Sequence, residues 1–342
     1  MEITLANYDV KQEVTDKYSL RGRVFTKIRE DILSGRYKEH EELKEIKIGK
    51  ELGVSRTPVR EALRQLELEG LVQIIPNRGA WLEFETDQND LYYVRIDKNR
   101  KLPITTFIRA LGLGSDAQIL DYFGEEPMLL ATLEKDSTKS REEALLEVYR
   151  KLRPGEPPTI ETSEQHLNNL FFDARRYDIS RVGRYKYNKK LALERRIAGM
   201  TLAEPAADPL TGEVLFEAGA TLTRDDAALL DKKGVREVLV DVDGHKVKVI
   251  SNNMVDAEDY LDLSKEELEE LFINEKVRFS VVTEIAEKAG DDKEALIALV
   301  KENVDELIPK HIIIDDIFSS INYMLNLYWG FGSTDDIDHL GN

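Results

Sequence analysis

The side chains with the clearest chemical potential lie in the stretch VSRTPVREALRQLELEGL. Five hydroxyl or guanidinium side chains fall in the first two turns of the helix that it predicts: Ser55, Arg56, Thr57, Arg60 and Arg64. Such groups can bond to the base edges and phosphates of duplex DNA when the first turn of a helix enters the major groove. The stretch therefore predicts a DNA-recognition helix. An ordinary amphipathic helix with solvated arginines is the alternative.

The apolar residues of the same stretch decide which face of the helix is buried. Val59, Leu63 and Leu66 recur at helical spacing, so we expect them to face a core and the arginines to point away from it. Ser55 or Thr57 can cap the first turn of this helix. Pro58 lies near the first turn, where no backbone donor is needed, and Gly70 suits the C-terminal end. Cap, stripe and stop all agree on one helix.

Two further helices are predicted before this one. Val24, Ile28, Ile32 and Leu33 recur at helical spacing within residues 21–34, and Gly35 can end the helix. A second, shorter helix fits residues 45–52 and also ends at a glycine. Two short helices and a tight turn would hold the recognition helix in place.

A β-hairpin is predicted directly after the recognition helix. Residues 70–87, GLVQIIPNRGAWLEFETD, contain an apolar run, a Pro-Asn-Arg-Gly turn and a strand of alternating residues. Helix, helix, tight turn, helix and hairpin is the order of a winged helix-turn-helix. We predict this domain over residues 19–83, after an N-terminal arm of residues 1–18.

The rest of the chain predicts a mixture of helices and short strands. LYYVRIDKNRKLPITTFIRALG indicates a strand, a basic turn and a helix, and a further helix over residues 142–152 ends at RPGEPP. Residues 198–256 contain short strands with Gly and Asp turns, and residues 256–310 are acidic and helical. The predicted fold class is therefore α+β and multidomain.

Composition excludes several classes of protein. The 342 residues contain no cysteine, which excludes disulfides, thiol catalysis and cysteine-ligated zinc. The net charge is -18, but residues 201–342 carry 13 Lys and Arg against 32 Asp and Glu, so the first 200 residues can present basic surfaces. No signal peptide or membrane span is expected, and we expect a cytoplasmic protein.

Catalysis finds little support in the sequence. Asp335, Asp336 and Asp338 form one short acidic turn without a second set of ligands, and the five histidines lack ligand spacing. GLGSD at residues 112–116 is a glycine-containing turn rather than a phosphate loop. We therefore expect no catalytic residue, no metal and no cofactor, and enzyme activity is left open with the balance against it.

An aromatic residue of the hairpin is a candidate for stacking on a base. On its second strand, Leu82 and Phe84 share one face, while Trp81 shares the other with Glu83 and Glu85. A tryptophan on a polar face is either a partly covered packing residue or a stacking platform. Residues 175–196 also hold nine Lys and Arg with interleaved tyrosines, which suits either a nucleic-acid surface or solvated charges that pair with the acidic C-terminal part.

The stretch ELGVSRTPVREALRQLELEGLV, with RVFTKIREDIL before it, resembles the DNA-binding domain of the GntR family of bacterial transcription regulators. The resemblance covers residues 19–82. It implies that Arg56 and Arg60 contact DNA and that Arg78, at the wing tip, reaches phosphate or the minor groove. The family reads two-fold sites as dimers, which admits a homodimer. Nothing after residue 90 resembles its effector-binding and dimerising domain.

The segments that follow resemble the lobe of the bacterial RNA polymerase β subunit. IIPNRGAWLEFE, VRIDKNRKLPITTFIRALG, LRPGEPPT, LNNLFFDARRYDISRVGRYKYNKKL and DDIDHLGN stand in that family's order within residues 74–342. The resemblance implies a lobe-like domain of residues 74–197 and 257–342. Residues 198–256 then correspond to a β-rich, lineage-specific insert, expected to decorate the surface without chemistry.

The β-subunit resemblance also implies a site. In that family the residues matching Trp81, Arg153 and Asp338 line a pocket for unpaired bases of the non-template strand. An indole can stack on a base, a carboxylate can accept from guanine, and a guanidinium can hold backbone or base. The pocket would be partial here, because its other contributors lie in β-subunit sequence that this chain lacks.

Three hypotheses follow for the whole chain. The first is a non-catalytic DNA-binding transcription protein, with a winged helix on duplex DNA and a lobe that contacts non-template single strand. The second is a fragment of the β subunit of DNA-directed RNA polymerase, active only when assembled with other polymerase subunits. The third is an artificial fusion without an evolved joint function.

Overall fold

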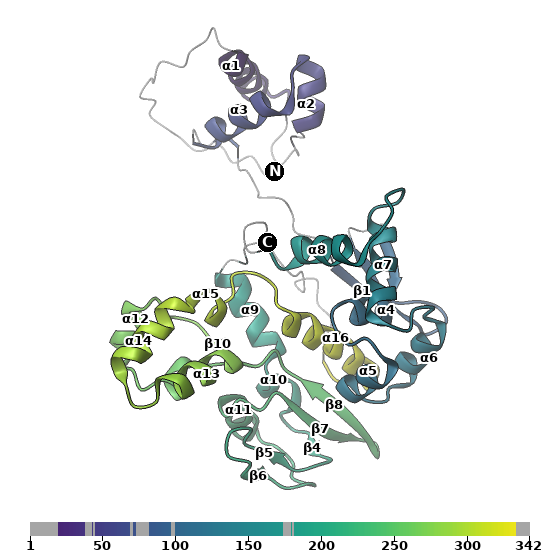
Figure 1. The fold of residues 1–342 in the computed structure, drawn as a ribbon, viewed down its shortest axis with the longest axis vertical. Coiled ribbons are helices and arrows are strands. Elements are labelled where there is room, and N and C mark those ends of the chain that lie inside the picture. The colour runs from purple at the N-terminus through teal and green to yellow at the C-terminus, as the bar shows by residue number, and fades with distance from the viewer. Residues whose placement is uncertain are drawn as a thin grey trace. The chain divides into compact units, whose positions relative to one another are not determined.

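The computed structural model describes residues 20–37, 43, 45–68, 71–72, 82–96, 100–173, 179 and 181–332. The chain divides into two compact units, residues 1–78 and 79–342 (Figure 1). The predicted arm of residues 1–18 and the turn of the predicted hairpin lie outside the described residues. Helices and small sheets make up unit two, which confirms the α+β class.

The first unit contains the three predicted helices, α1 (Leu20–Leu33), α2 (Glu45–Leu52) and α3 (Arg56–Leu68). Apolar side chains from all three share one core, and those of α3 include the predicted stripe. The buried members are Val24, Phe25, Ile28, Ile32, Leu43, Ile48, Val59, Ala62, Leu63, Leu66 and Val72. Because the apolar stripe of α3 packs against α1 and α2, these two short helices can hold α3 in a fixed orientation.

A tight turn joins α2 to α3. Gly53 adopts a φ of +65°, in the left-handed region that glycine enters without strain, and the amide of Val54 donates to the carbonyl oxygen of Gly49. A Cβ on Gly49 would lie 3.0 Å from the carbonyl oxygen of Val54. The close approach of α2 to the turn therefore favours glycine at position 49. Both glycines therefore set the angle between the two helices.

The second unit begins with a three-stranded antiparallel sheet in the order β1-β2-β3. Its strands are β1 (Leu82–Thr86), β2 (Tyr92–Ile96) and β3 (Arg100–Pro103). Leu82 lies opposite Ile96 and Phe84 opposite Val94, so these side chains share the face that packs on the core. The sequence predicted one strand, a basic turn and a helix here. The structure has a second strand, β3, directly before α4, and residues 97–99 lie outside the described residues.

Five helices complete the first core of this unit (Figure 1). They are α4 (Ile104–Ala110), α5 (Asp116–Phe123), α6 (Pro127–Lys135), α7 (Arg141–Leu152) and α8 (Ile160–Phe171). Phe107 of α4 meets Phe171 of α8 edge to face, with ring centroids 5.7 Å apart. Residues of the last long helix, α16 (Ile314–Tyr328), also join this core, including Ile317 and Ile321. Segments distant in sequence therefore share one interior.

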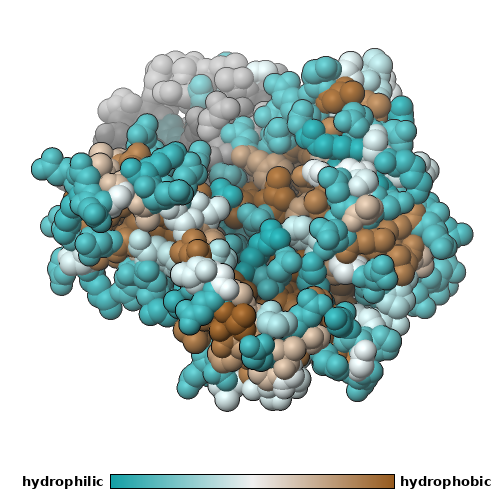
Figure 2. Space-filling view, turned by 60° about the horizontal axis from the view of Figure 1, so that its bottom comes forward, coloured by the Kyte–Doolittle hydropathy of each residue, from teal (hydrophilic) through white to brown (hydrophobic). Residues whose placement is uncertain are grey.

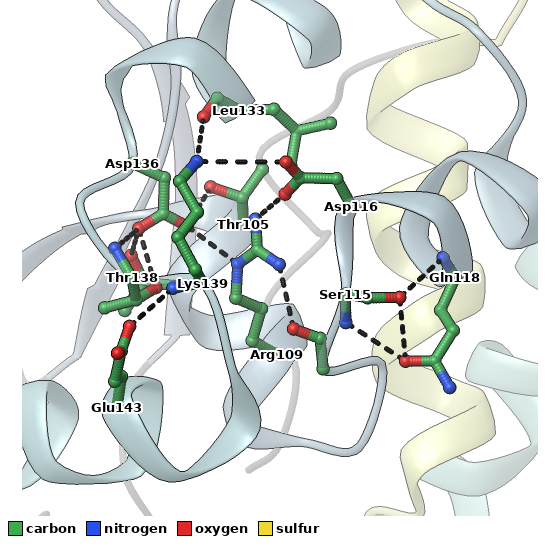
Figure 3. A network of polar contacts seen from close by, with 12 residues as sticks. Thr105, Arg109, Ser115, Asp116, Gln118, Leu133, Asp136, Thr138, Lys139 and Glu143 are labelled. Carbon is green, nitrogen blue, oxygen red and sulfur yellow. Dashed lines mark hydrogen bonds and ion pairs between the residues drawn. The ribbon is translucent and has the colours of Figure 1, made fainter.

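A buried arginine connects the loops of these helices (Figure 3). Arg109 of α4 is fully buried and donates to Asp136, to Asp116 and to the carbonyl oxygen of Gly114. The Thr105 hydroxyl donates to Asp136 at 2.7 Å. Because Asp136 follows α6 and Asp116 begins α5, this network fixes the loops around the N-terminus of α7.

The predicted β-rich insert has its own core. Its sheet has the order β4-β7-β8, and β5 pairs with β6; β7 and β8 form an antiparallel hairpin. Its elements are β4 (Thr201–Leu202), β5 (Ala206–Ala207), β6 (Val214–Phe216), α11 (Arg224–Lys232), β7 (Glu237–Val242) and β8 (His245–Ile250), and α10 (Leu193–Ile197) directly precedes it. Apolar side chains of these elements pack together, including Leu202, Leu230 and Val240.

Residues 254–308 form a region of acidic helices around a third apolar core. Its elements are β9 (Met254–Val255), η1 (Ala257–Asp259), α12 (Lys265–Glu270), β10 (Val277–Arg278), α13 (Phe279–Ala289), α14 (Lys293–Glu302) and α15 (Val304–Leu307). Buried Leu268, Val282 and Val300 come from three of these helices. We call this region the acidic subdomain. Within the described part of the chain, no helix is both long and apolar enough to cross a membrane.

Candidate nucleic-acid interface

Of the six predicted DNA contacts, Ser55 precedes α3, four lie within α3 and Arg78 follows it. Ser55 is exposed and directly precedes the helix. Positions 56, 60 and 64 are four residues apart, so the helical repeat places them in one row beside the buried stripe. The side chains of Arg56, Thr57, Arg60 and Arg64, and the whole of Arg78, lie outside the described residues. Their contacts with DNA therefore stay predictions.

Other charges of the first unit are paired at the end of α1. Asp31 bonds to Lys27 and to Arg36, both at 2.8 Å, and Arg36 also pairs with Glu51 of α2. Burial acts to raise the pKa of Asp31, but the two basic partners outweigh it and hold the pKa below its usual value. These charges therefore connect α1 to α2 and serve the fold of the unit.

The strand after Trp81 has the two faces that its alternation predicts. Leu82 and Phe84 pack on the core, while Glu85 bonds to Arg95 at 2.8 Å and to Lys101 at 2.7 Å. The hydrogen bonds from Arg95 and Lys101 lower the pKa of Glu85. This face of the sheet is therefore charged and only partly buried. Trp81 itself lies outside the described residues, so its place on the charged face stays a prediction.

Arg153 lies at the C-terminal end of α7, in the turn that leads to α8. Its side chain is 53% exposed and its Nη1 lies 3.8 Å from Oε1 of Glu156. The Tyr149 hydroxyl donates to the other oxygen of Glu156 at 2.8 Å, and this hydrogen bond raises the pKa of Tyr149. The weak, exposed ion pair leaves the guanidinium free to bind a phosphate or a base.

Helix α7 holds the backbone of Arg153 in a fixed position. Ser140 caps its N-terminus by accepting from the amide of Glu143, and Arg141 bonds to Glu164 of α8 at 2.5 Å. Ala144, Leu145 and Val148 are buried against the core. Asp338 lies outside the described residues. Of the three residues predicted to line the single-strand pocket, the described part of the chain therefore contains Arg153 alone.

The basic stretch of residues 175–196 is divided between burial and exposure. Arg184 of α9 (Arg181–Leu191) is buried and pairs with Asp316. Arg196 is buried as well and bonds to Asn322 and Asn326 of α16, each at 2.6 Å, and burial lowers its pKa to about 9. These two arginines serve the fold, which composition alone did not reveal. The pairing of Arg184 with the C-terminal part confirms the prediction of such pairs.

An open groove of about 720 Å³ lies beside the C-terminal end of α11. Lys232 pairs with Asp259 at 2.7 Å and Lys233 with Asp208 at 3.2 Å, so its basic side chains already have acidic partners. Within the described ranges, no group of three or more His, Asp or Glu side chains could hold a metal ion. The predicted acidic turn at residues 335–338 lies outside them.

Two family models match the chain. Residues 20–82 match the family described as bacterial regulatory proteins, gntR family, and residues 71–200 match RNA polymerase Rpb2, domain 2. The two matched ranges share residues 71–82, the region of the predicted hairpin.

Curated relatives extend the second match. The chain is 52% identical over 269 residues to the DNA-directed RNA polymerase subunit beta of Clostridium acetobutylicum and to that of Clostridium novyi. It is 52% identical over 270 residues to the same subunit of Acetivibrio thermocellus. Each alignment covers 79% of this chain and 21% of the relative, so the chain spans about a fifth of the length of these relatives. The chain therefore combines a segment similar to the GntR family of regulatory proteins with a longer segment similar to the RNA polymerase β subunit, as its sequence motifs predicted.

Proposed function

We propose that the chain is a non-catalytic, DNA-binding transcription protein. In this proposal the first unit binds duplex DNA through Arg56, Arg60 and Arg78, with Ser55 and Thr57 bonding at the start of α3. Arg64 adds a contact one turn later. The observation that carries the proposal is the packing of Val59, Leu63 and Leu66 in one core with α1 and α2, which leaves the row of positions 56, 60 and 64 outside that buried stripe.

The test is duplex binding by the full chain across a salt series. Replacing Arg56 and Arg60 by Ala should weaken binding, because two phosphate or base contacts are lost. The slope of log affinity against log salt should flatten by roughly one for each phosphate contact removed. Fluorescence anisotropy with a labelled duplex measures both quantities.

A matched control separates local contacts from the loss of net charge. Lys265 and Lys288 of the acidic subdomain are exposed, with side chains 77% and 61% accessible. Replacing both by Ala removes the same charge and should leave duplex binding unchanged. Unchanged binding in the Arg56→Ala/Arg60→Ala chain would instead contradict a duplex-binding function for α3.

The second unit would supply a partial surface for single-stranded DNA. Trp81 would stack on an unpaired base, Arg153 would hold backbone or base, and Asp338 would accept from guanine. The exposed guanidinium of Arg153 at the end of a well-packed helix supports its part of this surface. Alanine variants of Arg153 and of Arg150, on the same helix, test its contribution.

A homodimer is part of the same proposal. Regulators that read two-fold sites do so with two helix-turn-helix units, one on each half-site. A duplex with two inverted half-sites should therefore bind the chain more tightly than a duplex with one.

The identity to the β subunit favours a second candidate function, assembly with other RNA polymerase subunits. Over 269 residues the chain is 52% identical to the β subunit, and buried apolar side chains of the second unit form a shared core. Mixing the purified chain with polymerase subunits and β segments that lack this region tests the candidate. A stable complex on size exclusion would support it, and separate elution would contradict it.

A further inference from the structure

The acidic subdomain carries an exposed aromatic side chain in an unusual backbone conformation. Phe272 is 82% exposed and has a φ of +61°. Its amide donates to the carbonyl oxygen of Glu269, and the amide of Ile273 donates to that of Leu268. These bonds end α12 in a Schellman motif, with Phe272 at the position that glycine usually takes. A bulky residue with positive φ is an outlier of the kind that clusters at functional sites.

The residues on each side of Phe272 fix its direction. Leu271 and Ile273 are buried in the third core, so the phenyl ring cannot turn inward without displacing them. Glu269 and Glu270, at the end of α12, are exposed beside it. Residues 256–310 carry 17 Asp and Glu against 7 Lys and Arg. The Phe272 ring is thus an exposed apolar group beside acidic side chains.

Helix α9 presents the opposite combination. Its inner face is held by the Arg184–Asp316 ion pair and by Asn188, which accepts from Asn252. Val182 and Tyr185 are 64% and 61% exposed. Lys186 and Lys189 are also exposed, and the ammonium of Lys189 lies 5.5 Å from the centroid of the Tyr185 ring. The outer face of α9 thus carries exposed apolar side chains beside basic ones.

An ion pair joins the two regions that carry these side chains. Arg181, the first residue of α9, lies 3.5 Å from Glu275, which follows Phe272 by three residues. A surface with a basic half and an acidic half side by side is complementary to itself, because a two-fold axis brings each half of one copy onto the other half of its partner. Exposed aromatic anchors surrounded by complementary charge are the usual composition of protein interfaces.

We propose that a second copy of this chain covers this surface. In the dimer Phe272 of one copy packs on Val182 and Tyr185 of the other, and Glu269 and Glu270 meet Lys186 and Lys189. Both sets of contacts occur twice. The inference deepens the proposed function and rests on it in one respect: such a dimer supplies the two helix-turn-helix units that a two-fold DNA site requires.

Charge exchange tests the proposal with the full chain. We expect the unaltered chain to dimerise in sedimentation equilibrium, and Lys186→Glu/Lys189→Glu to weaken dimerisation at least about tenfold. Glu269→Lys/Glu270→Lys should do the same. An equimolar mixture of these two variants should dimerise again, because each altered half then meets an opposite charge. An unaltered chain that stays monomeric, or a mixture that does not recover, overturns the proposal.

The anchor is tested with a substitution that suits the backbone. Phe272→Gly keeps the left-handed conformation and removes the ring, so a folded variant that still dimerises as tightly as the unaltered chain also overturns the proposal. The Arg56→Ala/Arg60→Ala chain should dimerise normally. Failure of duplex binding and failure of dimerisation are therefore read in separate measurements.

Discussion

Arg184 and Asp316 form a buried ion pair across 132 residues of sequence, with Nη1 2.7 Å from Oδ2. The other oxygen of Asp316 accepts from Asn252 at 2.9 Å, and Asn252 also donates to Asn188. One carboxylate thus connects α9, α16 and the segment after β8. Each side chain of the pair is at most 2% exposed, so neither charge can be solvated if its partner is removed.

We expect Arg184→Ala to destabilise the second unit by about 3–5 kcal/mol, because it leaves a buried carboxylate without its cation. Urea unfolding followed by circular dichroism measures this free energy. Arg224→Ala is the control, since Arg224 pairs with Glu194 while its side chain is 72% exposed, and exposed pairs contribute about 0–1 kcal/mol. Equal losses in the two variants would contradict a special role for the buried pair.

Asp136 should make stability depend on acidity. Burial acts to raise its pKa, but hydrogen bonds from Thr105 and Thr138 outweigh it, so the pKa lies below the ordinary value of 3.8. A carboxyl with a lowered folded pKa stabilises the fold above its unfolded pKa, and that stability is lost as the pH falls through the folded pKa.

The Asp136→Asn variant tests this dependence. It should be less stable than the unaltered chain at neutral pH, and the difference should shrink as the pH falls below about 4. Urea midpoints measured at pH 7 and at pH 3 give both differences. A gap that is the same size at both pH values would show that the carboxylate charge does not stabilise the network around Arg109.

Phe272→Gly should stabilise the monomer. The left-handed conformation costs a residue with a Cβ about 1–2 kcal/mol, and the exposed ring buries little area in compensation. We expect a gain of about 1 kcal/mol in the free energy of unfolding under conditions where the chain is monomeric. Phe272→Ala, which keeps a Cβ, should not show this gain. A Phe272→Gly chain that is less stable would refute the account of strain.

Arg153→Ala should weaken binding of a single-stranded oligonucleotide, because an exposed guanidinium is lost from the proposed surface. Arg150 provides a close control on the same helix. Its side chain is 58% exposed and lies 3.6 Å from Glu147, whereas that of Arg153 is 53% exposed and lies 3.8 Å from Glu156. Both variants are measured by anisotropy in the Arg56→Ala/Arg60→Ala background. If both variants weaken oligonucleotide binding equally, Arg153 contributes only its charge and makes no specific contact.

The sequence predicted the helices of the first unit to within one or two residues. Apolar residues recur at a regular spacing in α1 and α3, and Gly35 and Gly53 follow the ends of α1 and α2. These signals are local, so they can be read without knowing the tertiary fold. Strand β2 and helix α4 were predicted for the same reason, whereas strand β3 between them was not.

Features that depend on contacts between distant segments could not be predicted. The basic stretch was counted as nine positive charges, but Arg184 and Arg196 are buried because their acceptors come from residues 250–326. Phe272 gave no local signal of exposure either, since apolar residues flank it on both sides. Charged and polar side chains cover most of the face in Figure 2, with apolar side chains exposed in separate patches. Which residues form such patches is decided by the tertiary fold.

The two stems of the β-rich insert meet at one point of the fold. Arg196, just before the insert, donates to the carbonyl oxygen of Ile250 at its end, and Ser319 of α16 donates to the same oxygen. Joining two chain ends that already lie close together costs little chain entropy. We therefore expect the predicted insert to tolerate changes in length, because its two ends are already held together.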